Sequence, residues 1–202
     1  MATALYFPLQ AIVAAAWPRP YSFTLNTISD LGITTCGVVQ HAPGRDLVIC
    51  SPRHLLMNVG FVAFGVMTIA GAVLMRRALP RTRLTTTALT GVVVTGVGGI
   101  LVGLAPADVA PELHRLGALL RVPGVVAPLL VGLALRSQRP RLAAFCFAAA
   151  TVGAAGTAMF ALQLLGDRVG AAERLALDPF PIWSFVLGAA MLTGTSIDET
   201  ER

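Results

Sequence analysis

Apolar residues run along this chain in long stretches that short polar or proline-containing turns separate. Most stretches hold about 20 residues, the length that an α-helix needs to cross the hydrocarbon core of a bilayer. The pattern predicts one all-α domain over residues 1–202, a polytopic transmembrane bundle of six helices. The expected spans are residues 2–17, 54–75, 84–104, 111–135, 142–165 and 180–197, and residues 18–53 form an external loop.

The first expected span is the shortest, and it ends at the break Pro18-Arg19-Pro20. The small residues at positions 14–16 imitate the end of a cleaved signal peptide, but no basic segment precedes the apolar run. We therefore expect a retained helix. Trp17 and Tyr21 would anchor it in the membrane interface, where aromatic residues with a polar tip concentrate.

Composition points to lipid as the solvent for most of the chain. Of the residues, 55% are hydrophobic and 12% are charged, whereas a soluble domain carries about 25% charged residues. All 15 basic residues are arginine. A nucleic-acid-binding protein gathers its basic residues on one soluble face. These arginines lie between apolar spans instead, so we expect the bilayer, and no nucleic acid, as a partner.

The arginines also predict an orientation. The short turns after the second and fourth expected spans carry no acid and seven arginines, at positions 76, 77, 81, 83, 136, 139 and 141. The opposite side carries as many, but spread over longer and partly acidic segments. Because arginine density near the ends of spans marks the cytoplasmic side, we expect both termini in the cytoplasm and the protein in the cytoplasmic (inner) membrane of a bacterium.

Cys36 and Cys50 both fall in the expected external loop, while Cys146 lies alone within the fifth expected span. Disulfides persist outside the reducing cytosol. We therefore expect a bridge between Cys36 and Cys50 rather than two free thiols. On the chain-entropy estimate, closing a loop of about 15 residues stabilises the fold by about 3 kcal/mol.

Small residues recur at a spacing of about one helical turn inside two spans. The third expected span has Gly91, Thr95, Gly99 and Gly103, and the fifth has Ala144, Ala148, Gly153 and Gly156. Small residues on one face let neighbouring helices approach closely in a membrane. We expect these positions to be helix contacts rather than a binding site.

Polar residues gather at the external ends of the expected spans. His54 and Asn58 are four residues apart on one helix face, and His114 and Arg121 also share a face, seven residues apart. A pocket for a lipid or polyprenyl head group would have His114 as acid or base and Asp30 to orient it. The candidates are Asp30 and His114 for catalysis, and His54, Asn58, Asp108, Arg121 and Glu173 for substrate binding.

Arg121 is the most informative of these residues because apolar residues flank it on both sides. An arginine at the centre of a membrane costs about 2.5 to 3.5 kcal/mol, so a specific partner is expected. Asp30, Asp178 or a lipid phosphate held by the guanidinium fork would serve. The alternative is that Arg121 extends its side chain to the interface.

Each candidate also has a purely structural interpretation. Asp30, His54 and His114 would make a three-ligand zinc set, but no two of them have the close spacing of a zinc motif. We expect no metal and no other cofactor, and polar groups that satisfy helix ends instead. Ser29 and Ser51 lack the G-x-S-x-G motif of a serine hydrolase.

Several short motifs follow one another in the order found in a known family. They are Tyr21-Ser22, Ile28-Ser-Asp-Leu-Gly32, Asn58 with Gly65, Pro106-Ala-Asp108, His114 with Gly117-Ala118, and Glu173-Arg174 before Trp183. Over about residues 20–190 the chain resembles the bacterial and archaeal membrane family catalogued as domain of unknown function 998. The resemblance implies a six-helix membrane fold without an established activity. The insert 33–53, which carries two cysteines, departs from the family pattern.

Two classes of function remain open. One is a non-catalytic membrane component, such as an assembly partner, a sensor or a small transporter, whose polar residues connect helices. The other is an enzyme or binding protein that acts on a lipid head group at the outer leaflet. The second class requires a cavity around the polar residues, and the first requires a neighbour that satisfies each of them.

Overall fold

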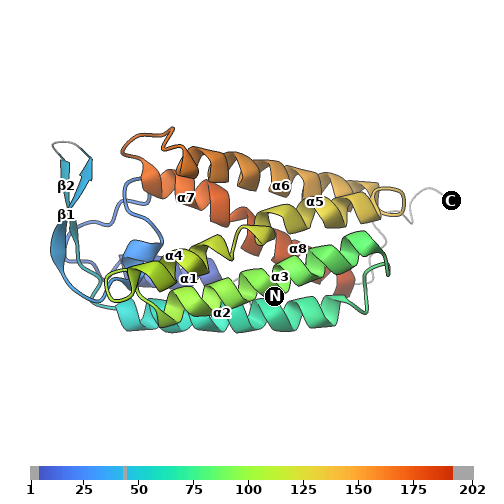
Figure 1. Ribbon diagram of the computed structural model, residues 1–202, viewed down its shortest axis with the longest axis horizontal. Coiled ribbons are helices and arrows are strands. Elements are labelled where there is room, and N and C mark those ends of the chain that lie inside the picture. Colours follow the sequence, from blue (N-terminus) through green and yellow to red (C-terminus); the bar gives the residue numbers. More distant parts are fainter. Residues whose placement is uncertain (1–4, 43–44, 193–202) are drawn as a thin grey trace.

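The computed structural model of the chain describes residues 5–42 and 45–192, and long antiparallel helices dominate it (Figure 1). A small β-hairpin projects at one end, which we call the hairpin end, and the turns 76–82 and 136–139 lie at the opposite, arginine end (Figure 1). The elements are α1 (Tyr6–Ala14), η2 (Ser29–Gly32), β1 (Gly37–Ala42), β2 (Arg45–Ile49), α2 (His54–Met75), α3 (Arg83–Leu104), α4 (Pro111–Leu119), α5 (Pro123–Leu135), α6 (Pro140–Ala161), α7 (Val169–Leu177) and α8 (Pro179–Leu192).

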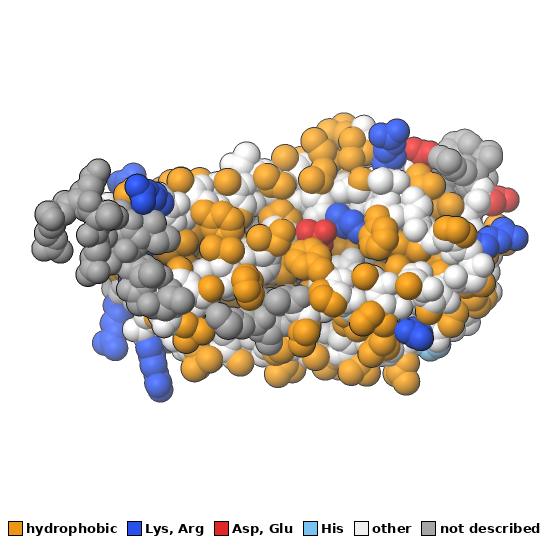
Figure 2. Space-filling model, turned by 180° about the vertical axis from the view of Figure 1, so that it is seen from behind, with side chains coloured by type: hydrophobic (Ala, Val, Ile, Leu, Met, Phe, Trp, Pro, Cys, Tyr) orange, Lys and Arg blue, Asp and Glu red, His pale blue; other side chains and the backbone are white. Residues whose placement is uncertain are grey.

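Five segments of the described chain are long and apolar enough to cross a membrane: α2, α3, α4 with α5, α6, and α7 with α8. They hold 22 to 25 residues, and 22 residues of helix reach about 33 Å, enough for a core of about 30 Å. Apolar side chains cover the middle of the molecule, and most charged ones lie at its two ends (Figure 2). The predicted all-α transmembrane bundle is confirmed, with α1 as the sixth helix.

The first helix differs from the expected span 2–17. Helix α1 has nine described residues, which reach only about 14 Å, and residues 1–4 lie outside the description. The described part of the chain therefore has five crossing segments rather than six. Helix α1 packs on α2 with a buried face that includes Tyr6 and Val13. Trp17 and Tyr21 pack edge to face, with ring centroids 4.9 Å apart.

The last crossing segment also begins earlier than expected. Residues 166–179 were expected as a polar loop, but from Val169 onward they form α7, and the expected end at 197 lies outside the described residues. A hydropathy scale scores Glu173 and Arg174 as polar whether or not their side chains have hydrogen-bonding partners. In the fold both find hydrogen-bonding partners, so the helix around them can be buried.

Two crossing segments are interrupted by proline. Helix α4 ends at Leu119 and α5 restarts at Pro123, while α7 ends at Leu177 and α8 restarts at Pro179. Proline lacks the N–H of a helical hydrogen bond and clashes with the preceding turn. Both interruptions place a charged residue inside the bundle, since Arg121 and Asp178 occupy the two breaks.

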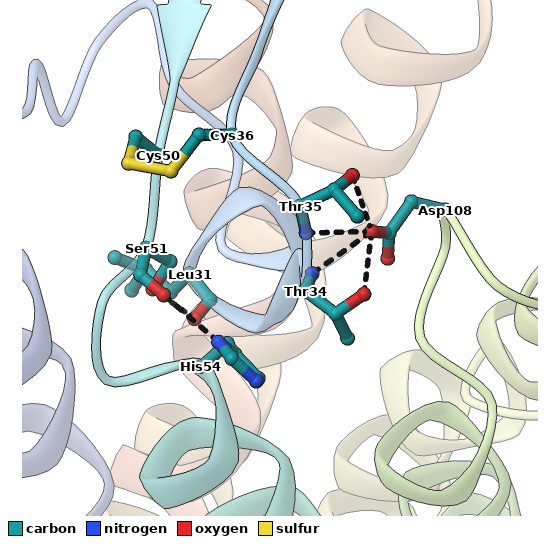
Figure 3. Close-up of a disulfide and its surroundings, with 8 residues drawn as sticks. All are labelled: Leu31, Thr34, Thr35, Cys36, Cys50, Ser51, His54 and Asp108. Atoms are coloured by element: carbon teal, nitrogen blue, oxygen red, sulfur yellow. Dashed lines mark hydrogen bonds between the residues drawn. A yellow bond between two sulfur atoms is a disulfide. The ribbon is translucent and has the colours of Figure 1, made fainter.

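The hairpin end holds structure within the expected external loop. Strands β1 and β2 pair in antiparallel register, with Gly37 opposite Ile49. Cys36 and Cys50 flank this pair and form the predicted disulfide (Figure 3). Cys146 is buried in α6, where it accepts a hydrogen bond from the Trp183 indole at 3.2 Å.

The small residues of α3 contact two different neighbours. A Cβ atom added to Gly99 would lie 3.3 Å from the Gly65 Cα of α2, and one added to Gly103 would lie 2.4 Å from the Asn58 carbonyl oxygen. Gly91 faces Pro123 of α5 instead. The predicted stripe thus seats α3 between α2 and α5 rather than against a single helix.

The α2–α3 contact gives a stability prediction. Gly65→Ala would place a methyl group 2.4 Å from the Gly96 carbonyl oxygen, so the helices must separate. Overpacking of this kind costs about 1–3 kcal/mol, and we expect the melting temperature of the purified protein to fall by several degrees. Gly71→Ala is the control, because a Cβ at Gly71 meets nothing within 4 Å. Equal melting temperatures for the two variants would contradict the contact.

Candidate functional site

Residues 21–35, which we call the docked segment, connect α1 to the hairpin and cross the ends of several helices. The segment includes the short helix η2, and its apolar side chains Ile28 and Leu31 are buried to 1% and 0% exposure. Most of the polar residues predicted to form a site make their hydrogen bonds to this segment. Its position therefore decides what those residues can do.

Asp108 holds one end of the docked segment. A single carboxylate oxygen, Oδ2, accepts hydrogen bonds from the backbone N–H and the hydroxyl of both Thr34 and Thr35, at 2.8 to 3.0 Å (Figure 3). Partial burial alone would raise the pKa of Asp108, but these hydrogen bonds outweigh it and hold that pKa below its usual range. Asp108 is thus an ionised anchor in the turn between α3 and α4.

Two residues around the start of α2 hold the centre of the docked segment. The Asn58 amide donates to the Gly32 carbonyl at 2.9 Å. The Ser51 hydroxyl donates to the Leu31 carbonyl at 2.7 Å (Figure 3). Gly32 must remain glycine, because a Cβ there would lie 2.3 Å from the Asn58 side chain. His54 stays local, with Nδ1 3.0 Å from the Ser51 carbonyl oxygen.

Asp30 acts within the docked segment itself. Its Oδ2 accepts from the Thr27 backbone N–H at 2.9 Å and from the Asn26 amide at 3.3 Å. An aspartate whose carboxylate binds a nearby backbone N–H stabilises a tight turn. The catalytic role expected for Asp30 requires a contact with His114, and none is seen among the described residues. The hydrogen bonds of the Asp30 carboxylate lie within this turn instead.

Arg174 clamps the start of the docked segment from α7. Its guanidinium donates to the carbonyl oxygens of Phe23 and Asn26 at 2.9 and 2.8 Å, and to the Tyr21 hydroxyl at 2.5 Å. It also lies over the rings of Tyr21 and Phe23. Burial raises the pKa of Tyr21, and the nearby Arg174 opposes this rise, so the phenol stays neutral and donates to Thr27.

His114 and Glu173 both contact Ser29, which is not among the residues predicted to form the site. His114 Nε2 lies 3.0 Å from the Ser29 hydroxyl oxygen, which lies 3.4 Å from Glu173 Oε1. The second oxygen of Glu173 accepts from the Ile28 backbone N–H. These contacts join α4, η2 and α7 at one point.

The tautomer of His114 follows from its other ring nitrogen. Nδ1 lies 2.8 Å from the Ala105 carbonyl oxygen, and a carbonyl oxygen can only accept, so Nδ1 carries a proton. In the neutral ring Nε2 is therefore an acceptor. The Ser29 hydroxyl has a single proton, so it donates either to this nitrogen or to Glu173 Oε1, and not to both at once. A serine hydroxyl facing an unprotonated imidazole nitrogen is the arrangement that general-base activation requires.

Arg121 is buried, with 6% exposure, in the break between α4 and α5. Its charge acts on Glu173, on Asp178 and on the hydroxyl of Tyr6. Asp178 is one of the two carboxylates suggested by the sequence as a partner. The burial of Arg121 does not support the alternative in which it reaches the interface.

Helix α1 adds polar atoms that the sequence does not identify as functional. Tyr6 and Gln10 are one turn apart and buried to 4% and 3% exposure. The Tyr6 hydroxyl, the Gln10 amide nitrogen and Asp178 Oδ1 have no hydrogen-bond partner among the described residues. Arg121 comes near the Tyr6 hydroxyl without reaching hydrogen-bond geometry. Buried polar atoms of this kind are ordinarily satisfied by water or a ligand.

The zinc alternative finds no ligand set in the described part of the chain. No three histidine, cysteine, aspartate or glutamate side chains there lie close enough together to hold a metal ion. His54 bonds to its own turn, Asp30 to its own segment, and His114 to Ser29 and Ala105. The three proposed ligands thus have separate partners.

The contacts of Asp108 give a prediction about the docked segment. Asp108→Ala removes all four hydrogen bonds to Thr34 and Thr35. Because the site is exposed, we expect a loss of about 1 kcal/mol of local stability, or about fivefold faster amide hydrogen exchange at residues 34–35. Glu112→Ala is the control, since Glu112 is exposed and pairs only with Arg115 among described ion pairs. Unchanged exchange in Asp108→Ala would contradict the anchor.

The pKa of Asp108 predicts how the anchor responds to acid. Its folded pKa is lowered, so its contribution to stability is present above the unfolded pKa of about 3.9 and is lost as the pH falls through the folded value. Exchange at residues 34–35, corrected for its intrinsic pH dependence, should therefore rise below about pH 4. The same acid-induced rise in Asp108→Asn would contradict this assignment.

Comparison with known proteins identifies the family. Searches of curated proteins and of solved structures found no significant match. A family model described as "Protein of unknown function (DUF998)" matches residues 1–190, which is nearly the whole chain. The family carries no assigned activity that could be transferred to the contacts of Ser29, His114 and Glu173. The predicted resemblance is confirmed, and this chain is a member of the DUF998 family.

Proposed function

We propose that this protein is a non-catalytic membrane component whose hairpin end forms a rigid external platform for assembly with a partner. The observation that supports it is the use of the polar residues. Asn58, Asp108 and Arg174, from three separate parts of the bundle, all direct their hydrogen bonds to backbone or hydroxyl groups of the docked segment. Side chains that make such hydrogen bonds connect structural elements, and few of their polar groups remain to bind a substrate.

The positions of the cavities agree with this proposal. Cavities of about 280 to 800 Å³ lie between α2 and α3 at the arginine end, between α3 and α5, between α1 and α2, and between α2 and α8. Their walls do not include His114, Ser29, Glu173 or Asp108. None of these four cavities gives a head group room beside the acid and base that such an enzyme needs.

We further propose that the arginine end faces the cytoplasm and the hairpin end the exterior. The dense arginines of the turns 76–82 and 136–139 support this orientation, as does a disulfide at the other end. The end of α8 at Leu192 then lies at the cytoplasmic face, because α8 runs towards the arginine end (Figure 1). The cytoplasmic side of the N-terminus stays a prediction, because residues 1–4 lie outside the described part of the chain.

Cysteine labelling in intact cells tests the orientation. Glu112→Cys adds an exposed thiol near the hairpin end, and Gln138→Cys adds one at the arginine end, while Cys146 is buried and Cys36 is bonded. We expect a membrane-impermeant maleimide to label Glu112→Cys in intact cells and Gln138→Cys only after permeabilisation. The reverse pattern would overturn the orientation.

A second candidate function is a serine hydrolase that acts on a lipid ester at the hairpin end. The contact of Ser29 with the acceptor nitrogen of His114, at 3.0 Å, favours it. His114 would take the hydroxyl proton as Ser29 Oγ bonds to the acyl carbon, and would return that proton to the departing alcohol. Water would then hydrolyse the acyl-enzyme.

A fluorophosphonate probe distinguishes the two functions, because it bonds covalently to activated serines. If the protein is non-catalytic, we expect no labelling of Ser29, and we expect Ser29→Ala to lower the melting temperature by a few degrees through loss of its hydrogen bonds to His114 and Glu173. Labelling of the wild type that disappears in both Ser29→Ala and His114→Gln would overturn the non-catalytic proposal. Ser184→Ala is the control, since Ser184 bonds only to its own helix among described partners.

A further inference from the structure

A cleft at the arginine end combines positive charge with apolar walls. It lies between the end of α2 and the start of α3 and has a volume of about 800 Å³. Arg76, Arg81 and Arg83 stand around it, and its floor includes the buried side chains of Leu79 and Leu89. None of the described residues that line it is acidic. The cleft therefore offers positive charge that no lining carboxylate neutralises.

The turn that carries two of these arginines has a fixed shape. Thr82 caps α3, because its hydroxyl accepts from the Thr85 backbone N–H at 3.2 Å while the Thr85 hydroxyl accepts from the Thr82 N–H at 3.0 Å. The Thr85 hydroxyl also donates to the Pro80 carbonyl. Arg81 and Arg83 flank this capped turn, so their backbone positions are set before any ligand binds. A preorganised site loses less conformational freedom on binding.

The cleft continues into an apolar groove along α3. Thr86, Thr87 and Thr90 line both spaces. The second space has a volume of about 500 Å³, and its walls run along α3 and α5 through Val94 and Val126. Both helices are membrane-crossing segments. A charged opening at the end of the bundle thus leads into an apolar groove at the depth of the lipid chains.

The combination selects an amphiphile over other anions. A free phosphate or a nucleotide would pair with the arginines but would not fill the apolar groove. A neutral lipid would fill the groove but would leave the arginines without an anion. Basic pockets between transmembrane helices bind anionic lipid head groups, and the arginine fork matches phosphate oxygens. We propose that the cleft binds the phosphate head group of an anionic phospholipid, with one acyl chain lying in the groove between α3 and α5.

The site is independent of the proposed function, because it lies at the opposite end of the bundle from the docked segment (Figure 1). Its test uses the delipidated full chain in detergent. We expect phosphatidylglycerol at saturation to raise the melting temperature by about 5–10 °C, because a ligand stabilises the state that binds it. Phosphatidylcholine with the same acyl chains should raise it far less.

Charge-matched variants locate the site. Arg76→Gln with Arg83→Gln removes two charges from the cleft and should abolish most of the difference between the two lipids. Arg77→Gln with Arg136→Gln removes two charges from the same end of the molecule but not from the cleft walls, and it should keep that difference. All four positions are exposed, so folding should survive. Equal losses in both double variants, or an equal response to both lipids, would overturn the proposal.

Two further measurements separate a lipid from other occupants. Val94→Trp fills the groove and should reduce the response to phosphatidylglycerol, and inorganic phosphate alone should give no response in the wild type. A full response to phosphate, or an unchanged response in Val94→Trp, would show a free-anion site and overturn the lipid assignment. Neutralising the acidic residues Asp198, Glu199 and Glu201 should leave lipid selectivity intact. If lipid selectivity appears only after this neutralisation, the acidic tail of the chain itself occupies the cleft, and the lipid assignment is overturned.

Discussion

The Glu173 carboxylate joins parts of the chain that lie 145 residues apart, by accepting the Ile28 backbone N–H. A carboxylate with 7% exposure in a membrane helix needs hydrogen-bond donors. The docked segment supplies them, and in return Glu173 and its neighbour Arg174 fix where that segment lies. With the segment in place, Ile28 and Leu31 complete the core, and Asn58 and Asp108 find the backbone groups that they bind.

The proline breaks extend this arrangement deeper into the bundle. A continuous α4–α5 helix would satisfy its own backbone throughout and leave Arg121 on a regular helix face. The interruption at Pro123 places Arg121 in the break between α4 and α5, and Asp178 occupies the break between α7 and α8. Because an isolated charge is costly in lipid, a buried arginine at such a break needs polar neighbours. The polar atoms of Tyr6 and Gln10 face the bundle beside α2 and add to this internal polarity.

The two ends of the molecule have different chemistry. At the hairpin end, Asp108 and Arg174 bond to backbone groups of the docked segment, and a disulfide closes the hairpin. At the arginine end, the guanidinium groups of Arg76, Arg81 and Arg83 surround a cleft without acidic lining. The first arrangement stabilises a fixed shape, and the second leaves positive charge available to an anion at the membrane surface.

The sequence by itself determined the crossing segments 54–75 and 111–135, the turns rich in arginine and the cysteine pair, because segment length, charge density and compartment leave few alternatives. It placed Glu173 in a loop, since hydropathy cannot register a partner 145 residues away. It also extended the first helix to residue 17, whereas α1 ends at Ala14. Only the tertiary structure brought Ser29 to His114 and gave Asp30 and His54 separate partners. Such contacts depend on how helix ends meet in space, and the spacing of residues along the chain does not encode that.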